Sequence, residues 1–234
     1  MNLKQEAASK ALEFIQNGMV LGLGSGSTTS YFVDMLGEKL GQGRWKDIRA
    51  VPTSEDTARQ ARKWGIQITH LSEYLQLDLV VDGADEVDPQ LNLIKGLGQA
   101  LLREKVVEIH AKRFIVIVDQ SKLVPRLGTH VPLPVEIIQF EAESHVRWLN
   151  TLGCRAELWV EEDGSPVVTD NHNYLVRCWF EGDQASGKDP GISDAYALAQ
   201  QLSVRPGIVE HGLFLDMADL VISAGEDGIR LLER

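Results

Sequence analysis

Short apolar runs without polar alternation are the strongest constraint on how this chain can fold. They occupy residues 19–24, 48–54, 66–71, 77–83 and 114–121. Segments with helical spacing separate them. Strands buried on both faces of a parallel sheet are continuous apolar runs, and parallel neighbours are joined by helical crossovers. The first half therefore predicts an α/β fold with a doubly wound parallel sheet.

The separating segments carry helix signals of their own. We expect helices at 3–16, 28–40, 54–65 and 98–112. Ser54 is placed to begin the third of these helices and Gly65 to end it. In the fourth, Leu102, Val106 and Ile109 follow i, i+4, i+7 spacing, which predicts an apolar face.

The pattern changes after three prolines at 125, 132 and 134. The expected order is then strand, helix, two strands and helix. The corresponding ranges are 133–138, 142–152, 154–160, 174–180 and 194–203, with a turn at Asp163–Gly164 between the second and third strands. That order is typical of a ferredoxin-like α+β unit. We therefore expect a main domain at 1–129 plus 206–234, in which the tail returns as strands with a hairpin at 227–228, and a smaller domain at 130–205.

Composition excludes several classes of protein. The 234 residues include 23 Lys and Arg against 34 Asp and Glu, a net charge of −11, which disfavours binding to nucleic acid or to anionic membranes. Apolar runs stay well short of about 18 residues, and the N-terminal segment resembles no signal peptide, so we expect a cytoplasmic protein without membrane contact. Cys154 and Cys178 could pair only if neighbouring strands bring them together; two small apolar side chains in a reducing compartment is the favoured interpretation.

The segment GLGSGSTT (22–29), after the first apolar run, has the composition of an anion-binding loop. Glycines let a backbone approach an anion, which N–H groups and hydroxyls at a helix start then bind. The dinucleotide pattern GxGxxG fails because its third glycine falls on Ser27 or Thr29, and the Walker pattern GxxxxGK[ST] is absent. A small phosphate monoester is favoured over NAD or ATP. The alternative is a tight strand-to-helix turn with a Ser/Thr cap.

Four acidic residues lie within DGADEVD (82–88), after the fourth run. Asp82 and Asp85 are three residues apart, so a turn could aim both into one cleft, where carboxylates hold sugar hydroxyls or exchange protons. A solvated acidic loop and a divalent-metal site are the alternatives. Lys95 argues against a metal because it already supplies positive charge. The six histidines show no ligand spacing, and we assign none.

The segment KGLGQALLREK (95–105) reads as a glycine turn that enters a helix. Its backbone N–H groups could form an oxyanion hole beside Lys95. Glu104 lies between two basic residues, and by position alone such a glutamate is usually an exposed ion-pairing residue. Lys122 is either a surface lysine or a phosphate clamp, and spacing does not decide between these.

Together these segments resemble a known family. With DQSKLV (119–124), PLPVEII (132–138), VVTDNHNYLV (167–176) and PGIVEHGLF (206–214), the chain is similar to ribose-5-phosphate isomerase of type A over almost its whole length. The resemblance implies a Rossmann-like domain with a ferredoxin-like lid. It also implies interconversion of ribose 5-phosphate and ribulose 5-phosphate, in the non-oxidative pentose phosphate pathway, without metal or organic cofactor, by a homodimer or homotetramer.

The resemblance also implies roles for single residues. Glu104 would be the base that moves a proton through a cis-enediolate, assisted by Asp82, Asp85 and Lys95. The residues implied to bind substrate are Lys4, Ser25, Gly26, Ser27, Thr28, Asp82, Gly83, Ala84, Asp85, Lys95, Gly96, Leu97, Gly98 and Lys122.

Two departures from the family pattern bear on these roles. Ser25 stands where the family often has threonine, and it keeps the hydroxyl. Leu97 and Gln99 interrupt what is often a run of glycines. Leu97 could not adopt a positive φ cheaply, so a positive φ at this position would strain the oxyanion hole.

Three other functions are consistent with parts of the sequence. A different sugar-phosphate isomerase or deaminase of related fold is the enzyme alternative, against which Glu104 and the KGLG turn argue. A phosphosugar-sensing regulator would need a DNA-binding module, and the chain has neither an N-terminal helix-turn-helix segment nor a basic face. A nucleotide-binding dehydrogenase is weakened by the broken fingerprint.

Overall fold

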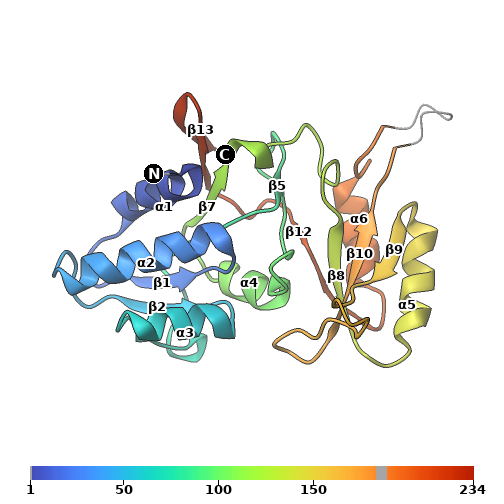
Figure 1. The fold of residues 1–234 in the computed structure, drawn as a ribbon, viewed down its shortest axis with the longest axis horizontal. Coiled ribbons are helices and arrows are strands. Elements are labelled where there is room, and N and C mark those ends of the chain that lie inside the picture. The colour runs from blue at the N-terminus through green and yellow to red at the C-terminus, as the bar shows by residue number, and fades with distance from the viewer. Residues whose placement is uncertain (1, 183–188) are drawn as a thin grey trace. The chain divides into compact units, whose positions relative to one another are not determined.

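The computed structural model describes residues 2–182 and 189–234, which form two compact units (Figure 1). The first comprises Met1–Ala84, Arg103–Lys122 and Asp216–Arg234, and the second comprises Asp85–Leu102 and Leu123–Leu215. The boundaries expected near 130 and 205 both lie inside the second unit. The difference arises because Ile94 and Leu213, which the sequence analysis placed in the main domain, pack into the core of the second unit.

A seven-stranded sheet is the centre of the first unit, with the order β14-β13-β7-β4-β1-β2-β3. Its strands pair in parallel except β14, which is antiparallel to β13. The predicted doubly wound sheet and C-terminal hairpin are therefore confirmed, although β3 is much shorter than expected. The bounds are β1 Val20–Leu23, β2 Arg49–Pro52, β3 Gln67–Ile68, β4 Leu79–Asp82, β7 Phe114–Asp119, β13 Leu220–Gly225 and β14 Gly228–Glu233.

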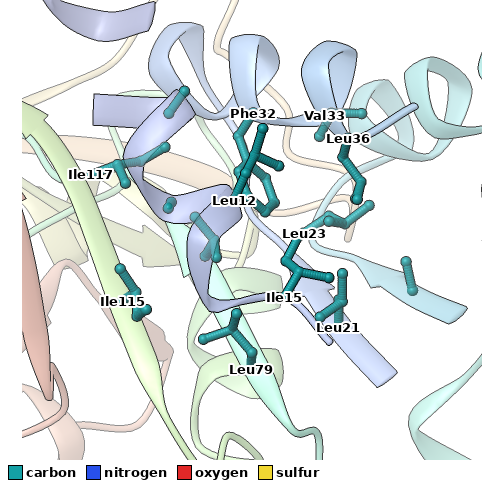
Figure 2. Close-up of a cluster of buried hydrophobic side chains, with 14 of the residues drawn as sticks. Leu12, Ile15, Leu21, Leu23, Phe32, Val33, Leu36, Leu79, Ile115 and Ile117 are labelled. Atoms are coloured by element: carbon teal, nitrogen blue, oxygen red, sulfur yellow. The ribbon is translucent and has the colours of Figure 1, made fainter. Parts of the chain in front are cut away.

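Helices α1 (Leu3–Ala11), α2 (Ser27–Gly41) and α3 (Glu55–Lys63) contribute to one apolar core against this sheet. Figure 2 shows side chains of α2 meeting side chains of the neighbouring strands in that core. The residues labelled there are Leu12, Ile15, Leu21, Leu23, Phe32, Val33, Leu36, Leu79, Ile115 and Ile117.

The predicted ends of α3 are confirmed. The Ser54 side chain accepts a hydrogen bond from the Thr57 N–H at 3.1 Å, so it caps the first turn. Gly65 follows the helix with φ +69°, a left-handed conformation that glycine adopts without the steric cost of a Cβ.

Helix α4 (Leu101–Glu108) presents a different face to the protein from the one its apolar spacing predicted. Val106 and Ile109 are 41% and 66% exposed, so the predicted apolar face was wrong. The buried positions include Glu104 and Glu108, at 3% exposed each, together with Val107. A Cβ built on Gly22 would lie 2.9 Å from Val107 Cγ1, which places this face of α4 against β1.

The second unit contains a four-stranded antiparallel sheet with the order β11-β8-β10-β9. The chain order β8-α5-β9-β10-α6-β11 with this strand order is the ferredoxin-like arrangement that the sequence predicted. The helices contribute Leu149, Leu198 and Leu202 to its core. The bounds are β8 Leu133–Ile137, α5 Ala142–Leu149, β9 Arg155–Leu158, β10 Tyr174–Trp179, α6 Ala195–Ser203 and β11 Ile208–His211.

A second, smaller sheet in this unit joins β5 (Glu86–Val87), β6 (Leu93–Ile94) and β12 (Leu213–Phe214), in the order β12-β6-β5. Both cysteines remain free thiols. A hydrogen bond with Cys154, together with burial, raises the pKa of Cys178. Among the residues that the structure describes, no helix combines the length and apolarity needed to cross a bilayer.

Candidate functional site

The strand order of the first unit places a ligand site at the carboxyl ends of β1 and β4. From β1 the chain proceeds to β2 and β3 on one side, and then returns to β4 on the other side. In doubly wound sheets, ligands bind outside the carboxyl ends of the strands at such a reversal. The glycine loop continues from β1 at Gly24, and the acidic DGADEVD segment begins at Asp82, the last residue of β4.

Asp82 holds the loop that follows β1. Its Oδ1 atom accepts hydrogen bonds from the Ser25 N–H at 3.0 Å, the Thr29 hydroxyl at 3.0 Å and the Gly83 N–H at 2.6 Å. The side chain is fully buried. A buried carboxylate is costly unless several donors satisfy it, so the loop and the aspartate depend on each other.

Two glycines of the loop are required for different reasons. A Cβ on Gly24 would lie 1.9 Å from Asp82 Cγ, so only glycine lets the carboxylate come this close. Gly26 precedes α2 with φ +102° and ψ 176°, a conformation that is essentially restricted to glycine, and space around it is open.

The Ser25 hydroxyl points into a cluster of hydroxyl groups from the segment after β2. Its Oγ lies 2.8 Å from Thr53 Oγ1 and 2.7 Å from Ser54 Oγ. Thr57 closes the cluster by donating to the Gly24 carbonyl at 3.0 Å. The Ser25 hydroxyl therefore anchors the loop to the segment that follows β2.

The exposed part of the loop lies at the start of α2. Gly26 and Ser27 are exposed, and Thr28 is half-buried. Lys4, from α1, donates to Ser27 Oγ at 2.8 Å, so an ammonium group lies beside the helix N-terminus. A cation, a hydroxyl and the N–H groups of a helix start are a favourable environment for a phosphate.

Glu104 is buried although its neighbours in sequence are charged. Its neighbour Arg103 forms an ion pair, with Nη1 at 2.9 Å from Glu55 Oε1. Glu108, one turn further along α4, is equally buried, and the sequence analysis did not single it out. The i, i+4 spacing of Glu104 and Glu108 was the sequence signal that could have placed both on one face of the helix.

In the second unit, Asp85 is joined to the KGLG turn. Its Oδ2 accepts from the Leu97 N–H at 2.9 Å, and its own N–H donates to the Ile94 carbonyl at 2.8 Å. Positive φ angles occur at Gly96 (+108°) and Gln99 (+65°) but not at Leu97. The strain anticipated at Leu97 is thus absent there, and the non-glycine residue with a left-handed backbone is Gln99.

Lys95 precedes this turn and is 2% exposed. Its N–H donates to the Gly212 carbonyl at 2.9 Å. Its Nζ lies 5.4 Å from the centroid of the Phe214 ring. A buried ammonium group is unusual, because lysine is rarely buried without compensating contacts.

The predicted site residues are thus distributed over both units. Lys4, residues 25–28, residues 82–84, Glu104 and Lys122 belong to the first unit, and Asp85 and residues 95–98 belong to the second. Lys122 ends a 3-10 turn after β7. Within residues 2–182 and 189–234, no group of three or more His, Cys, Asp or Glu side chains is arranged to hold a metal ion.

Comparison with known proteins gives consistent matches. The model of the family described as ribose 5-phosphate isomerase A (phosphoriboisomerase A) matches residues 49–228. A ribose-5-phosphate isomerase A from Roseiflexus castenholzii is 46% identical over 230 residues, covering 98% of this chain and 94% of that protein.

Two solved structures are similar over their whole length. One is a D-ribose-5-phosphate isomerase in complex with phospho-erythronic acid, with a TM-score of 0.92 at 42% identity and complete coverage of both chains. The other is the ribose 5-phosphate isomerase from Plasmodium falciparum, with a TM-score of 0.92 at 36% identity, covering 99% of this chain and 98% of that one.

Proposed function

Since the chain belongs to the ribose 5-phosphate isomerase A family and is an aldose–ketose isomerase of that type, we propose that it interconverts ribose 5-phosphate and ribulose 5-phosphate through a cis-enediolate, with Glu104 as the base. Glu104 removes the proton from carbon 2 of the open-chain aldose and returns it to carbon 1. One carboxylate suffices for both transfers if it can reach both carbons.

The burial of Glu104 is the observation that supports this role. A glutamate on a helix surface is solvated, whereas Glu104 is 3% exposed. Removing a carboxylate from water is costly, and such groups are frequently retained for chemistry.

We assign the phosphate of the substrate to the start of α2. Lys4, Ser27 and the N–H groups of residues 26–28 offer a cation and hydrogen-bond donors there. Lys122 is proposed as a further substrate contact. A dianionic phosphate gains from both the helix dipole and the ammonium charge.

We assign the sugar to the DGAD segment and the enediolate charge to the KGLG turn. Asp82 to Asp85 would hold hydroxyls and assist ring opening, while Lys95 and the N–H groups of residues 96–98 stabilise the developing oxyanion. The Leu97 N–H donates to Asp85 Oδ2 at 2.9 Å, so it would serve the oxyanion only by exchanging this bond.

The test compares the wild type with Glu104→Gln in the conversion of ribose 5-phosphate, with EDTA present. We expect kcat to fall by about 10²–10⁴-fold, the usual effect of losing a general base. Glu108→Gln is the matched control, because it makes the same change at an equally buried glutamate of the same helix. Equal activity of Glu104→Gln and the wild type would remove Glu104 as the base, and loss of activity in EDTA would contradict the metal-free reaction.

A second observation can test the nature of the intermediate. One similar structure was solved with phospho-erythronic acid, whose carboxylate resembles an enediolate in charge and shape. We expect this compound to inhibit the present enzyme competitively. The cytoplasmic location stays a prediction from the sequence, and the homodimer or homotetramer stays a prediction from the resemblance.

A further inference from the structure

We propose that strand β12 is a positioning element for Lys95, in which the Phe214 ring holds the ammonium group in place by a cation–π contact. The inference rests on the role proposed above for Lys95. Strand β12 belongs to the PGIVEHGLF segment, to which the proposed mechanism assigns no role.

The backbone of Lys95 is held by this strand. Strands β12 and β6 pair in antiparallel register, with Leu213 opposite Ile94 and Phe214 opposite Leu93. The register continues by one residue, because the Lys95 N–H donates to the Gly212 carbonyl at 2.9 Å. Gly212 is therefore the residue directly across from Lys95.

Gly212 allows an approach that no other residue would allow. A Cβ at this position would lie 2.3 Å from the Lys95 carbonyl oxygen and 2.9 Å from Pro134 Cδ. The Gly212 N–H donates to the Pro134 carbonyl at 2.8 Å. The main chain of Lys95 is thus tied through one glycine to β8 of the larger sheet of this unit.

The same register brings the Phe214 ring to the Lys95 side chain. Side chains two residues apart on a strand share a face, so Lys95 shares the face of Leu93 and is the diagonal neighbour of Phe214. Because Gly212 has no side chain, nothing directly opposite Lys95 blocks this diagonal approach. The result is the 5.4 Å separation between Nζ and the ring centroid, with the ring itself fully buried.

A ring face suits this task better than a carboxylate would. A lysine has four carbons of flexible stem, and fixing it costs side-chain entropy that a preformed contact offsets. An aromatic ring attracts a cation by its quadrupole but carries no net charge. The ring therefore helps to orient the ammonium group without adding a negative charge beside it.

The first experiment replaces Phe214 by leucine. We expect kcat to fall by about 5- to 30-fold, the range that corresponds to a desolvated cation–π contact, with little change in KM. Phe180→Leu is the matched control, since Phe180 is a buried phenylalanine in the apolar core of the same unit. Thermal melting establishes that each variant is folded. If Phe214→Leu does not fold, Phe214→Met, whose unbranched and flexible side chain adapts to the space of the ring, takes its place.

The second experiment changes the quadrupole without changing the shape. Site-specific replacement of Phe214 by phenylalanines with one, two and three ring fluorines should lower log kcat stepwise. A role in packing alone predicts no such series, so a flat series in folded protein would overturn the proposal.

A double-mutant comparison separates this inference from the proposed function. In a Lys95→Met background, Phe214→Leu should have no further effect on kcat, because the group that the ring positions is gone. If Lys95→Met retains wild-type kcat, the proposed role of Lys95 fails. If Lys95→Met is impaired but Phe214→Leu is not, the role of Lys95 stands and the positioning role of Phe214 is wrong.

Discussion

The Ser25 N–H donates to Asp82 Oδ1 across 3.0 Å, a bond between residues 57 positions apart in the chain. It joins the carboxyl ends of β1 and β4, where the strand order of the sheet reverses. Each of the two motifs is ambiguous in isolation. Their direct contact makes the glycine loop and the acidic segment parts of one structure, whose integrity can be tested residue by residue.

Thr29→Val should weaken this structure. Thr29 is buried and its hydroxyl donates to Asp82 Oδ1 at 3.0 Å, so valine keeps the shape but removes a donor from a buried carboxylate. Leaving such a group less satisfied costs about 1–3 kcal/mol in the free energy of unfolding. Urea unfolding measures the effect. Thr29→Ser, which keeps the hydroxyl, should restore most of the loss, and equal destabilisation by serine would show that packing of the methyl group is the cause.

Gly24→Ala and Gly26→Ala should impair the protein for different physical reasons. At position 24 a Cβ would lie 1.9 Å from Asp82 Cγ, so we expect displacement of the carboxylate and loss of both stability and activity. At position 26 space is open, and the cost is the backbone conformation alone, about 1–3 kcal/mol. Thermal melting and kcat measured together distinguish the two. A Gly24→Ala protein as stable and active as the wild type would contradict the close approach.

Much of the fold was predictable because burial of the parallel strands leaves a direct trace in sequence. Continuous apolar runs at residues 19–24 and 77–83 correspond to β1 and β4, and the order of elements in the second unit identified the ferredoxin-like arrangement. Helix α4 is an exception. Val106 in this helix and Ile109 just after it are exposed, while Glu104 and Glu108 are buried, so the apolar spacing predicted the wrong face.

The candidate site could be predicted as a set of residues but not as a set of contacts. The sequence does not show that the Ser25 hydroxyl faces Thr53 and Ser54, because that contact depends on the pairing of β1 with β2. Nor does it show that the left-handed backbone falls on Gln99 rather than Leu97, since a turn of this length can place positive φ at more than one position.

Lys4→Met should weaken substrate binding more than catalysis. The Lys4 ammonium lies 2.8 Å from Ser27 Oγ at the start of α2, where we place the phosphate. Loss of one charged hydrogen-bond donor should raise KM for ribose 5-phosphate about tenfold and leave kcat nearly unchanged. Lys10→Met is the control, because Lys10 lies on the same helix but pairs with Glu13 at 2.6 Å. A fall in kcat with constant KM would instead place Lys4 in the chemical step.

Glu136 should make the stability of the protein depend on pH. It is fully buried in β8, and burial raises its pKa from the ordinary 4.5, with a further contribution from Glu210; hydrogen bonds from Asn173 at 2.9 Å and Thr169 at 3.0 Å act in the opposite direction. The folded protein therefore binds this proton more tightly than the unfolded chain. The stability gained is fully present below pH 4.5 and is lost as pH rises through the raised pKa.

The comparison with Glu136→Gln isolates this effect. Glutamine stays neutral at every pH, and the other titrating groups largely cancel in the difference between the two proteins. We expect the free energy of unfolding of the wild type, relative to Glu136→Gln, to decrease between pH 4 and pH 7 by about 1.4 kcal/mol for each unit by which the pKa is raised. Urea unfolding at both pH values measures this. Glu210→Gln should reduce the decrease, because it removes the neighbouring negative charge. A difference that stays constant or grows with pH would mean that Glu136 is well stabilised as a carboxylate in its buried position.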